Sequence, residues 1–548
     1  MFPGHATLSQ EFWARNMLAR VAAWPQASPW LGAAARCLSA SAAADPAALA
    51  SAAPAASSSS PGPGLAPPYY ALDDDQRAFQ QLAADFARAK LVEHSPDWDA
   101  RGHFPVDVLR EAAALGLAGM FVPEAFGGSA LSRLSASVVF EELAAGDVPF
   151  SAYLSIHNMV AGVVAKHARS DAARFASREE RERHQRRREA LLGRLCTMAS
   201  FAAYCLTEPA SGSDAASLST SARRGRCPAT GEEGWLLRGS KAFISGAGAA
   251  DVYLVMARVA DGAGGDGRVG DSAGGAGGGS AGGGSAGGQR ARAQAQGGAD
   301  GITAFLVDCH RAEGFAPAAS LTFGAPEKKM GWRMQPTRAV HLDDVFVPDF
   351  DVVGPLGGGF RAVALRALDG GRVNIGAASV GGAARALGLA ARYARSRRQF
   401  GARVWDFQAT RLRLADAATD VEAARLLVRR AAAALDAAAA AAAGGEGGEG
   451  GGAGGGDSCS APCAAAPLED EASALAAMAK RFASDRCFDA ANAALQTFGG
   501  YGYLSDYGVE QIVRDLRVHS LLEGTNEVMR LVVAKTLPLF VDAAAGAE

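Results

Sequence analysis

The stretch Leu521-Leu522-Glu523-Gly524-Thr525-Asn526-Glu527, near the C-terminus, places a carboxylate directly before a glycine and a hydroxyl residue. A glutamate beside leucines can act as a general base when an apolar pocket raises its pKa toward working pH. Glycine lets the backbone approach a ligand closely, and the threonine offers a hydroxyl to a cofactor. The alternative is an ordinary helix start, in which Glu523 is a first-turn acid favoured by the helix dipole.

A second informative segment, Tyr204 to Asp214, lies far upstream and reads YCLTEPASGSD. Its small and hydroxyl residues, Thr207, Ser211, Gly212 and Ser213, allow backbone N–H groups to converge on an electron-rich ring or a phosphate. The alternative for this segment is a simple capped turn.

Composition limits the class of protein. The chain has 548 residues, 49% of them hydrophobic, which is enough for a large core and more than one domain. A formal net charge of -3 gives no electrostatic reason to bind nucleic acid or an anionic membrane. No apolar run of the ~20 residues needed to cross a bilayer is evident, so a soluble protein is expected. The cysteines form no C-x-x-C pair, which disfavours a metal site or a disulfide framework and favours a reducing compartment.

Four segments differ in composition from the rest. Residues 1–68 are rich in Ala, Ser and Pro and carry more Arg than acid, which is typical of a transit peptide, with a disordered tail as the alternative. Gly262 to Gly298 and Ala437 to Ala466 consist mainly of Gly, Ala and Ser, and cannot bury enough apolar surface to offset their ordering entropy. We expect both to be disordered surface loops. Ser177 to Arg188 is dense in charge, which predicts an exposed face of a solvated helix.

The remaining sequence falls into three blocks by the spacing of its apolar residues. Phe79, Leu82 and Phe86 follow the i, i+3, i+7 spacing of an amphipathic helix, so the first block is predicted to be helical. The middle block contains short β-rich runs, such as Val252 to Met256. Helical spacing returns in the last block, where Gly499-Gly500 ends a helix as a C-cap would. The predicted domains are residues 69–201, 202–352 and 353–548.

A base and a small-residue loop together suit the oxidation of a thioester. Forming a double bond α,β to a thioester needs a base for the α-proton and an acceptor for the β-hydride. Because side chains cannot accept hydride, a cofactor is required. With the order helices, strands, helices, these segments resemble the acyl-CoA dehydrogenase family. The resemblance implies an α+β fold with an N-terminal helical domain, a middle β-barrel-like domain and a C-terminal four-helix bundle.

The resemblance also implies FAD as the cofactor and Glu523 as the catalytic base. The implied FAD contacts in this part of the site are Tyr204, Leu206, Thr207, Gly212, Ser213, Phe243, Ile244, Ser245 and Thr525. Family members usually have glycine where this chain has Ala210. If that position needs a positive φ, alanine costs about 1 kcal/mol and strains the loop. No G-x-G-x-x-G follows a predicted strand, so NAD binding is disfavoured.

A second group of FAD contacts is implied across a subunit interface. It consists of Arg398, Phe400, Gln408, Gln496, Gly499 and Gly500. In the family, the residue matching Arg398 contacts the FAD pyrophosphate of a neighbouring subunit, and the glycine segment contacts the adenine side. The alternatives are a solvated basic turn and an ordinary glycine cap. If both contacts carry over, the site requires at least a dimer, and a tetramer is usual in the family.

Three parts of the sequence, Leu368 to Ile375, Glu327 to Val340 and Arg517 to His519, resemble the branch of the family that converts isobutyryl-CoA to methacrylyl-CoA in valine degradation. Other branches supply the base from the position before the matching arginine, which is Gly371 in this chain, so no carboxylate competes with Glu523. The implied acyl-CoA contacts are Ser213, Asp369, Gly370, Gly371, Arg372 and Lys535. The alternatives are 2-methylbutyryl-CoA or butyryl-CoA as substrate, an acyl-CoA oxidase, and a catalytically inactive scaffold.

The resemblance extends to partners and location. It implies that electrons pass to electron-transferring flavoprotein, and that the protein is in the mitochondrial matrix rather than a plastid. No nucleic acid, membrane or metal partner is expected.

Overall fold

The computed structural model describes residues 71–259, 298–310, 320–445 and 465–545. The chain divides into two compact units, Met1–Leu72 and Asp73–Glu548, and every helix and strand given below lies in the second unit. The predicted transit peptide, residues 1–68, most of the predicted loop Gly262 to Gly298, and residues 446–464 therefore lie outside the described residues.

The first block is helical, as predicted. Its helices are α3 (Asp74–Phe86), η1 (Ala87–Leu91), α4 (Ser95–Arg101), α5 (Val106–Ala114), η2 (Glu124–Phe126), α6 (Arg133–Gly146), α7 (Val148–Ala172) and α8 (Arg178–Cys196). Asp73 begins α3 with a capping box, in which its side chain and that of Gln76 each bond the other's backbone N–H. Ser177 and Glu180 begin α8 in the same way.

Helix α7 is a long helix with an apolar sequence. Among the described helices it alone is long and apolar enough to cross a membrane, but 89% of that window is buried inside the protein. Packing accounts for its composition, because α7 lies against α6, α8, α11 and strands β1 and β8. The hydrophobicity of α7 therefore reflects a core helix.

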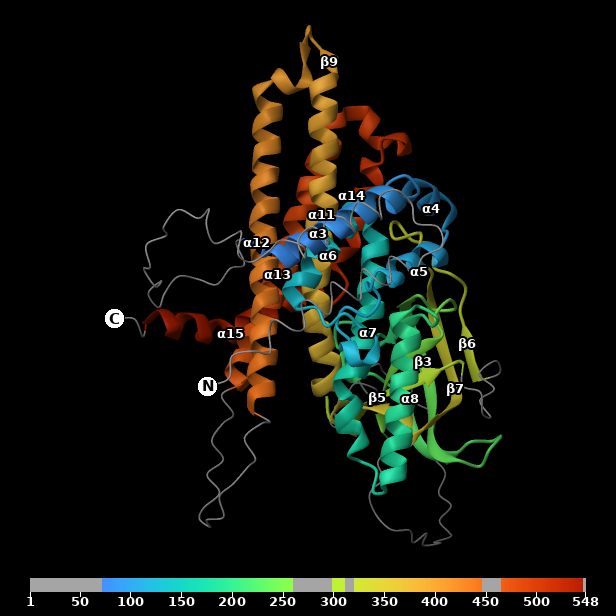
Figure 1. The fold of residues 1–548 in the computed structure, drawn as a ribbon. Coiled ribbons are helices and arrows are strands. Elements are labelled where there is room, and N and C mark those ends of the chain that lie inside the picture. The colour runs from blue at the N-terminus through green and yellow to red at the C-terminus, as the bar shows by residue number, and fades with distance from the viewer. Residues whose placement is uncertain (1–70, 260–297, 311–319, 446–464, 546–548) are drawn as a thin grey trace, which may run out of the picture. The chain divides into compact units, whose positions relative to one another are not determined.

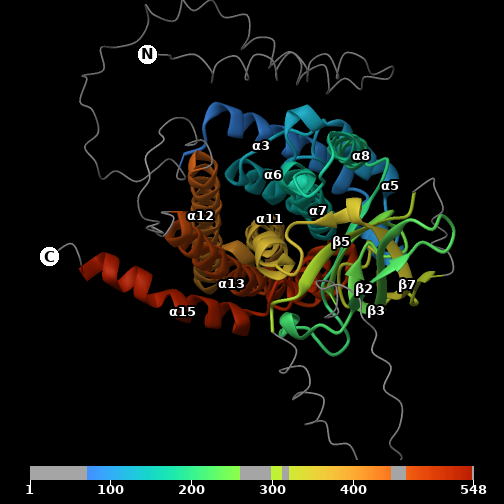
Figure 2. The same ribbon diagram turned by 90° about the horizontal axis from the view of Figure 1, so that it is seen from below.

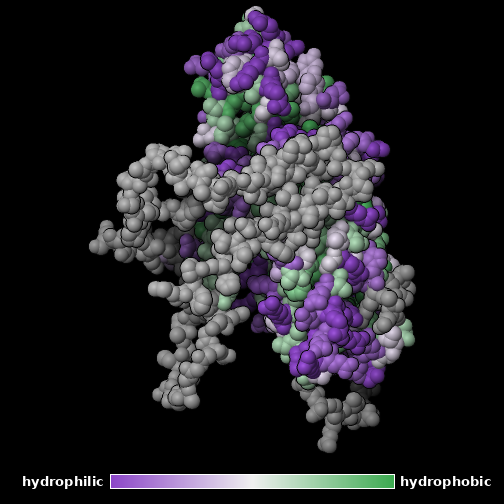
Figure 3. All heavy atoms as spheres, in the orientation of Figure 1, coloured by the Kyte–Doolittle hydropathy of each residue, from purple (hydrophilic) through white to green (hydrophobic). Residues whose placement is uncertain are grey.

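Helix α8 departs from its predicted exposure. The charge-dense run does form a helix, and its outward face is hydrophilic in Figure 3. However, His184 and Arg188 on the same helix are buried. The Arg188 guanidinium lies 3.7 Å from Asp171 and 3.9 Å from Asp351, so carboxylates from α7 and the end of the β domain surround it. The prediction of a solvated face was wrong for these residues, because composition alone does not reveal buried ion pairs.

The middle block is a mixed sheet of eight strands. The strands are β1 (Ala202–Cys205), β2 (Ser221–Arg226), β3 (Glu233–Ser245), β4 (Val252–Val259), β5 (Ile302–Asp308), β6 (Leu321–Phe323), β7 (Thr337–Pro348) and β8 (Val352–Val353). Their order is β6-β7-β3-β2-β4-β5-β8, and β1 pairs in parallel with β4. The centre of β4 and β5 is buried on both faces, which explains their near-continuous apolar sequence.

The last block is a helical bundle. It contains η5 (Phe360–Leu365), α11 (Arg366–Ser396), the hairpin β9 (Arg398–Gln399) and β10 (Ala402–Arg403), η6 (Val404–Asp406), α12 (Gln408–Gly445), α13 (Ala465–Phe498), η7 (Gly499–Tyr503), η8 (Ser505–Tyr507), α14 (Val509–Arg517), η9 (Val518–Ser520) and α15 (Asn526–Ala545). Helices α11, α12, α13 and α15 pack together beside the sheet, as Figures 1 and 2 show. The α+β fold is thus confirmed, and Gly499, with φ +60°, follows α13 as predicted.

Glycines allow α11 to pack closely in this bundle. A Cβ atom at Gly381 would lie only 2.0 Å from the carbonyl oxygen of Glu141 on α6. The Gly-rich and Ala-rich sequence of α11 therefore reflects the close approach of neighbouring helices.

The prediction of a disordered loop over Ala437 to Ala466 was wrong at both ends. Helix α12 continues through the alanine run to Gly445, and α13 begins at Ala465. Alanine has the highest helix propensity, and Ala438 is buried in the bundle. The low complexity of the alanine run therefore marks the end of a helix.

Candidate active site

Glu523 lies in the short turn between η9 and α15. It has φ +55° and Gly524 has φ +89°, so consecutive left-handed residues bend the chain sharply before Asn526 begins α15. This turn directs the Glu523 carboxylate against Gly371 of α11, where a Cβ atom would lie 2.5 Å from Glu523 Oε2. Glu523 is therefore outside the helix, which does not support the alternative of a first-turn acid.

The Glu523 carboxylate is held in a site that favours a proton acceptor near neutral pH. Its Oε2 atom is buried and has no hydrogen-bond partner. Burial raises the pKa of Glu523 to about 7, against the opposing effect of the positive charges of Arg372 and Lys480. A carboxyl group with a pKa near the operating pH is well matched to general base catalysis.

Asp369, Gly370, Gly371 and Arg372, predicted to line the acyl-CoA site, lie at the N-terminal end of α11. The Arg372 guanidinium donates from Nε to the carbonyl oxygen of Glu523 (3.3 Å) and forms a 2.6 Å ion pair with Asp369. Gly370 faces elsewhere, since a Cβ atom there would meet the Arg133 guanidinium at 2.6 Å. Arg372 and Gly371 thus adjoin Glu523, and Asp369 orients Arg372.

Lys480 is a site residue that sequence reasoning missed. It is fully buried on α13, and its Nζ donates to the carbonyl oxygen of Gly524 (2.8 Å) and to Asn526 Oδ1 (2.9 Å). Lysines are mostly exposed in proteins, so the residue type carries no signal of this position. The turn that carries Glu523 is consequently anchored to both α11 and α13.

The loop after β1 borders the same region. The Tyr204 hydroxyl is buried without a partner, and its pKa is raised by burial and by the charge of Glu523, which places the two residues near each other. Thr207 accepts a backbone hydrogen bond from Ala242 of β3 (2.9 Å). Leu206 packs its side chain into the core, so its backbone is the part available to a ligand.

The end of this loop is open and unstrained. A Cβ atom at Gly212 would meet nothing within 4 Å, and Ser213 is exposed. Ala210 is not among the residues with a positive φ, so the strain expected from the loss of glycine is absent.

A bulge in β3 presents the next predicted segment. The register of β3 against β7 shifts between Lys241 and Ile244, and Phe243 at this bulge has φ +58°. The Phe243 ring is 67% exposed, whereas Ile244 is buried in the core. Phe243 can therefore offer its side chain to a ligand and Ile244 only its backbone, while Ser245 is half-buried.

Thr525, predicted to contact the cofactor, directly precedes α15, and Lys535, predicted to contact CoA, lies within that helix. The Thr525 hydroxyl oxygen accepts from the backbone N–H of Val528 (3.3 Å), which caps the start of α15. Lys535 is exposed on the same helix.

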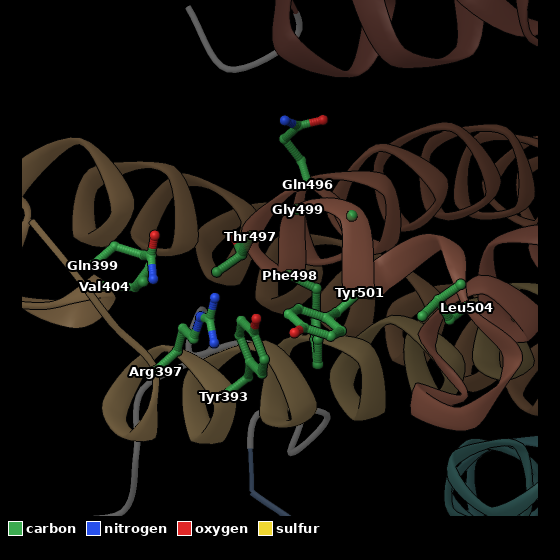
Figure 4. Close-up of a pocket in the computed structure, with 11 residues that line it drawn as sticks. Tyr393, Arg397, Gln399, Val404, Gln496, Thr497, Phe498, Gly499, Tyr501 and Leu504 are labelled. Carbon is green, nitrogen blue, oxygen red and sulfur yellow. The ribbon is translucent and has the colours of Figure 1, made fainter.

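The second predicted group of FAD contacts gathers around a pocket of about 420 Å³ (Figure 4). Its lining residues are Tyr393, Arg397, Gln399, Val404, Gln496, Thr497, Phe498, Gly499, Gly500, Tyr501 and Leu504. Arg397 lies in the pocket with its guanidinium 5.2 Å from the centre of the Tyr501 ring. The predicted residues Arg398, Phe400 and Gln408 are exposed nearby, Phe400 by 95%.

The two groups of predicted residues lie at opposite ends of α11. Arg372 is near the start of this uninterrupted helix, and Arg397 follows its end. At 1.5 Å per residue, Arg372 and Ser396 are about 36 Å apart. Figure 1 shows the β9 hairpin far from the sheet. One chain therefore does not bring the two groups together.

Comparison with known proteins identifies the class. Family models of the acyl-CoA dehydrogenase N-terminal, middle and C-terminal domains match residues 73–183, residues 203–271, and residues 357–448 with 461–537, respectively. The chain belongs to the acyl-CoA dehydrogenase family.

Particular relatives narrow the comparison. The chain is 39% identical over 470 residues to mitochondrial isobutyryl-CoA dehydrogenase of Dictyostelium discoideum, covering 86% of this chain and 91% of the relative. It is equally identical, 39% over 473 residues, to the mitochondrial isobutyryl-CoA dehydrogenase of Bos taurus, covering 86% and 90%. The solved structure of an acyl-CoA dehydrogenase of Bacillus anthracis complexed with FAD matches with a TM-score of 0.64 and 26% identity, covering 87% of this chain and 70% of that one.

Proposed function

We propose that this protein is a flavin-dependent dehydrogenase that converts isobutyryl-CoA to methacrylyl-CoA. The observation that carries the proposal is the Glu523 carboxylate, whose Oε2 atom is buried without a hydrogen-bond partner and lies against Gly371. The relatives of 39% identity over most of the chain support a short, branched acyl group. Family membership alone would leave the acyl chain open, because one methylene changes binding by only about 1–3 kcal/mol.

FAD fits the residues of the loop after β1 and of the β3 bulge. The exposed Phe243 ring at the β3 bulge offers an aromatic surface, and the loop at Gly212 leaves open space. Thr207 and Ser213 supply hydroxyls, and Tyr204 a buried hydroxyl without a partner. When bound, FAD supplies the hydride acceptor that no side chain can provide.

Glu523 performs the proton transfer in this proposal. Its carboxylate removes the α-proton of the acyl group and becomes a carboxylic acid, a form that burial favours. Arg372 and Lys480 hold the backbone of the turn, so the carboxylate stays aimed at one position above Gly371. Holding a reacting group in a fixed orientation contributes a large part of an enzyme's rate acceleration.

A second copy of the chain would complete the FAD site. The pocket at Arg397 and Gln496 is about 36 Å along α11 from Glu523, so we assign it to the FAD held by a neighbouring subunit. This assignment requires at least a dimer, and the resemblance to the family favours a tetramer. Electron-transferring flavoprotein is the proposed acceptor, and the mitochondrial matrix the proposed location, as in the named mitochondrial relatives.

Anaerobic titration of the FAD-loaded protein with isobutyryl-CoA, 2-methylbutyryl-CoA and butyryl-CoA tests the substrate. We expect isobutyryl-CoA to bleach the flavin absorbance fastest, because the relatives that support the assignment are isobutyryl-CoA dehydrogenases. A faster reaction with another acyl-CoA would keep the enzyme class and overturn the substrate. No bleaching by any of them would favour the inactive scaffold.

Replacing Gly371 by alanine tests the position of the base. The added Cβ would lie 2.5 Å from Glu523 Oε2, so the carboxylate must move. We expect the rate of flavin reduction to fall on the order of 10²-fold, the effect of misplacing a catalytic group by about 1 Å. Gly388→Ala on the same helix is the control, because a Cβ there meets only Arg392, at 3.6 Å. Equal rates in both variants would contradict the assignment.

A further inference from the structure

The turn that carries Glu523 has two successive carbonyl groups, and a different buried cation binds each. Arg372 of α11 donates to the carbonyl of Glu523 at 3.3 Å. Lys480 of α13 donates to the carbonyl of Gly524 at 2.8 Å. Left-handed backbone at a residue other than glycine is strained and persists only when the surroundings enforce it. The two cations are the groups positioned to enforce this turn.

Lys480 also fixes the start of α15. Its Nζ donates to Asn526 Oδ1 at 2.9 Å, and Asn526 Nδ2 donates in turn to Ser484 (2.9 Å) and Asp485 (2.6 Å). These partners of Asn526 all belong to α13. The residues on both sides of the Glu523-Gly524 turn are consequently held by one helix.

The two cations near Glu523, Arg372 and Lys480, differ in whether a carboxylate neutralises their charge. Arg372 forms a 2.6 Å ion pair with Asp369, which partly neutralises it. The Lys480 ammonium group donates to the carbonyl oxygen of Gly524 and to the amide oxygen of Asn526, both uncharged. Within the described part of the chain no carboxylate lies within ion-pair distance of Lys480, so its charge is less directly neutralised than that of Arg372.

We propose that Lys480 is a positioning residue for the catalytic base, which holds the Glu523-Gly524 turn in its left-handed form and stabilises the carboxylate form of Glu523 through its charge. This inference rests on the proposed role of Glu523 as the base. Lys480 does not touch the reacting atoms in this account; it acts through the turn and through its electrostatic field.

The surrounding groups give the direction of the effect. Those that act on Glu523 are Arg372 from α11 and Lys480 from α13, and the Tyr204 hydroxyl from β1 senses its charge. Those that act on Lys480 are Glu523, Arg372, Asp485 and Glu527. Burial lowers the pKa of Lys480 to about 8, so it is mainly charged at pH 7. When the charge of Lys480 is removed, less positive charge opposes the effect of burial, so the pKa of Glu523 rises.

The experiment compares how the rate of flavin bleaching by isobutyryl-CoA depends on pH. Because a base must be ionised, the rate increases as pH rises through the pKa of Glu523. In Lys480→Met and Lys480→Gln we expect this rise to move upward by about one pH unit or more. Lys90→Met is the control. It removes a lysine that is paired with Glu111 in the N-terminal helical block, and it should keep the wild-type pH profile. Lys480→Gln retains an uncharged amide NH2 group that can donate hydrogen bonds, and it guards against a misfolded Met variant.

A second readout does not depend on turnover. The infrared carboxyl signal that is lost in Glu523→Gln reports the protonation of Glu523 directly, and its midpoint should rise in both Lys480 variants. An unchanged profile and midpoint in folded, FAD-containing Lys480 variants would overturn the inference. If the wild-type protein itself does not bleach with any acyl-CoA, the proposed function fails instead, so the two failures are distinguishable.

Discussion

Replacing Glu523 by glutamine is expected to lower the rate of flavin reduction by isobutyryl-CoA by at least about 10²–10⁴-fold, the usual contribution of a general base. Glutamine has nearly the same shape but cannot take the α-proton. FAD and acyl-CoA should still bind, because the Arg372 and Lys480 bonds are made to backbone carbonyls that the substitution leaves unchanged. Rapid anaerobic mixing, followed by flavin absorbance, measures the effect.

Glu527→Gln is the matched control for this substitution. Glu527 is an exposed glutamate in the first turn of α15, and its loss should leave the rate near that of the wild type. Full activity in Glu523→Gln would remove Glu523 from the role of base.

Replacing Lys241 by methionine is expected to destabilise the protein by about 3–5 kcal/mol and to release FAD. Lys241 and Glu208 are both buried, and Lys241 Nζ donates to Glu208 Oε1 at 2.8 Å. Without Lys241, Glu208 remains as an uncompensated buried charge, which is the most costly way to break such a pair. Glu208 directly follows Thr207, so the loop proposed to contact FAD would lose its support.

Chemical denaturation and the FAD content of the purified variant measure these effects. Lys328→Met removes an exposed lysine and serves as the control. Lys241→Met combined with Glu208→Gln should recover part of the stability, because no unpaired charge is then buried. Wild-type stability and FAD content in the single variant would show that the pair does not support the loop.

The same pair gives a sign for the effect of acid. Burial alone would raise the pKa of Glu208, but Lys241 and the hydrogen bonds from Ser219 and Thr220 outweigh it and lower the pKa to about 2. A carboxyl group whose pKa is depressed by folding adds stability above its unfolded pKa. That contribution is lost as the pH falls from about 4.5 toward 2.

Periodicity was sufficient to predict the order of helices and strands, because apolar spacing reflects which face is buried. The predictions were wrong where the composition of a segment suggested a different structure from the one that its residues form. The alanine run after Ala437 is low in complexity, yet it continues α12, since propensity and a buried Ala438 favour helix. Arg188 lies within a run of charges, yet it is buried beside Asp171 and Asp351. Charge density describes a segment on average and not the burial of one residue in it.

The candidate site was predicted best where residue type itself carries the chemistry. Glu523 adjoins Gly371 and Arg372 in the structure, although 151 positions separate Arg372 from Glu523 in the sequence. Lys241 and Lys480 were missed because a buried lysine is recognisable only from its partners. The left-handed φ of Glu523 and Phe243 was equally hidden, because such backbone is rare in residues other than glycine and is imposed by tertiary contacts.

Anaerobic mixing of the FAD-loaded protein with isobutyryl-CoA deuterated at Cα tests the central claim most directly. If Glu523 removes the α-proton, the flavin absorbance should bleach more slowly than with unlabelled isobutyryl-CoA, and mass spectrometry should detect methacrylyl-CoA. Flavin that stays oxidised, with isobutyryl-CoA recovered unchanged, would contradict the account.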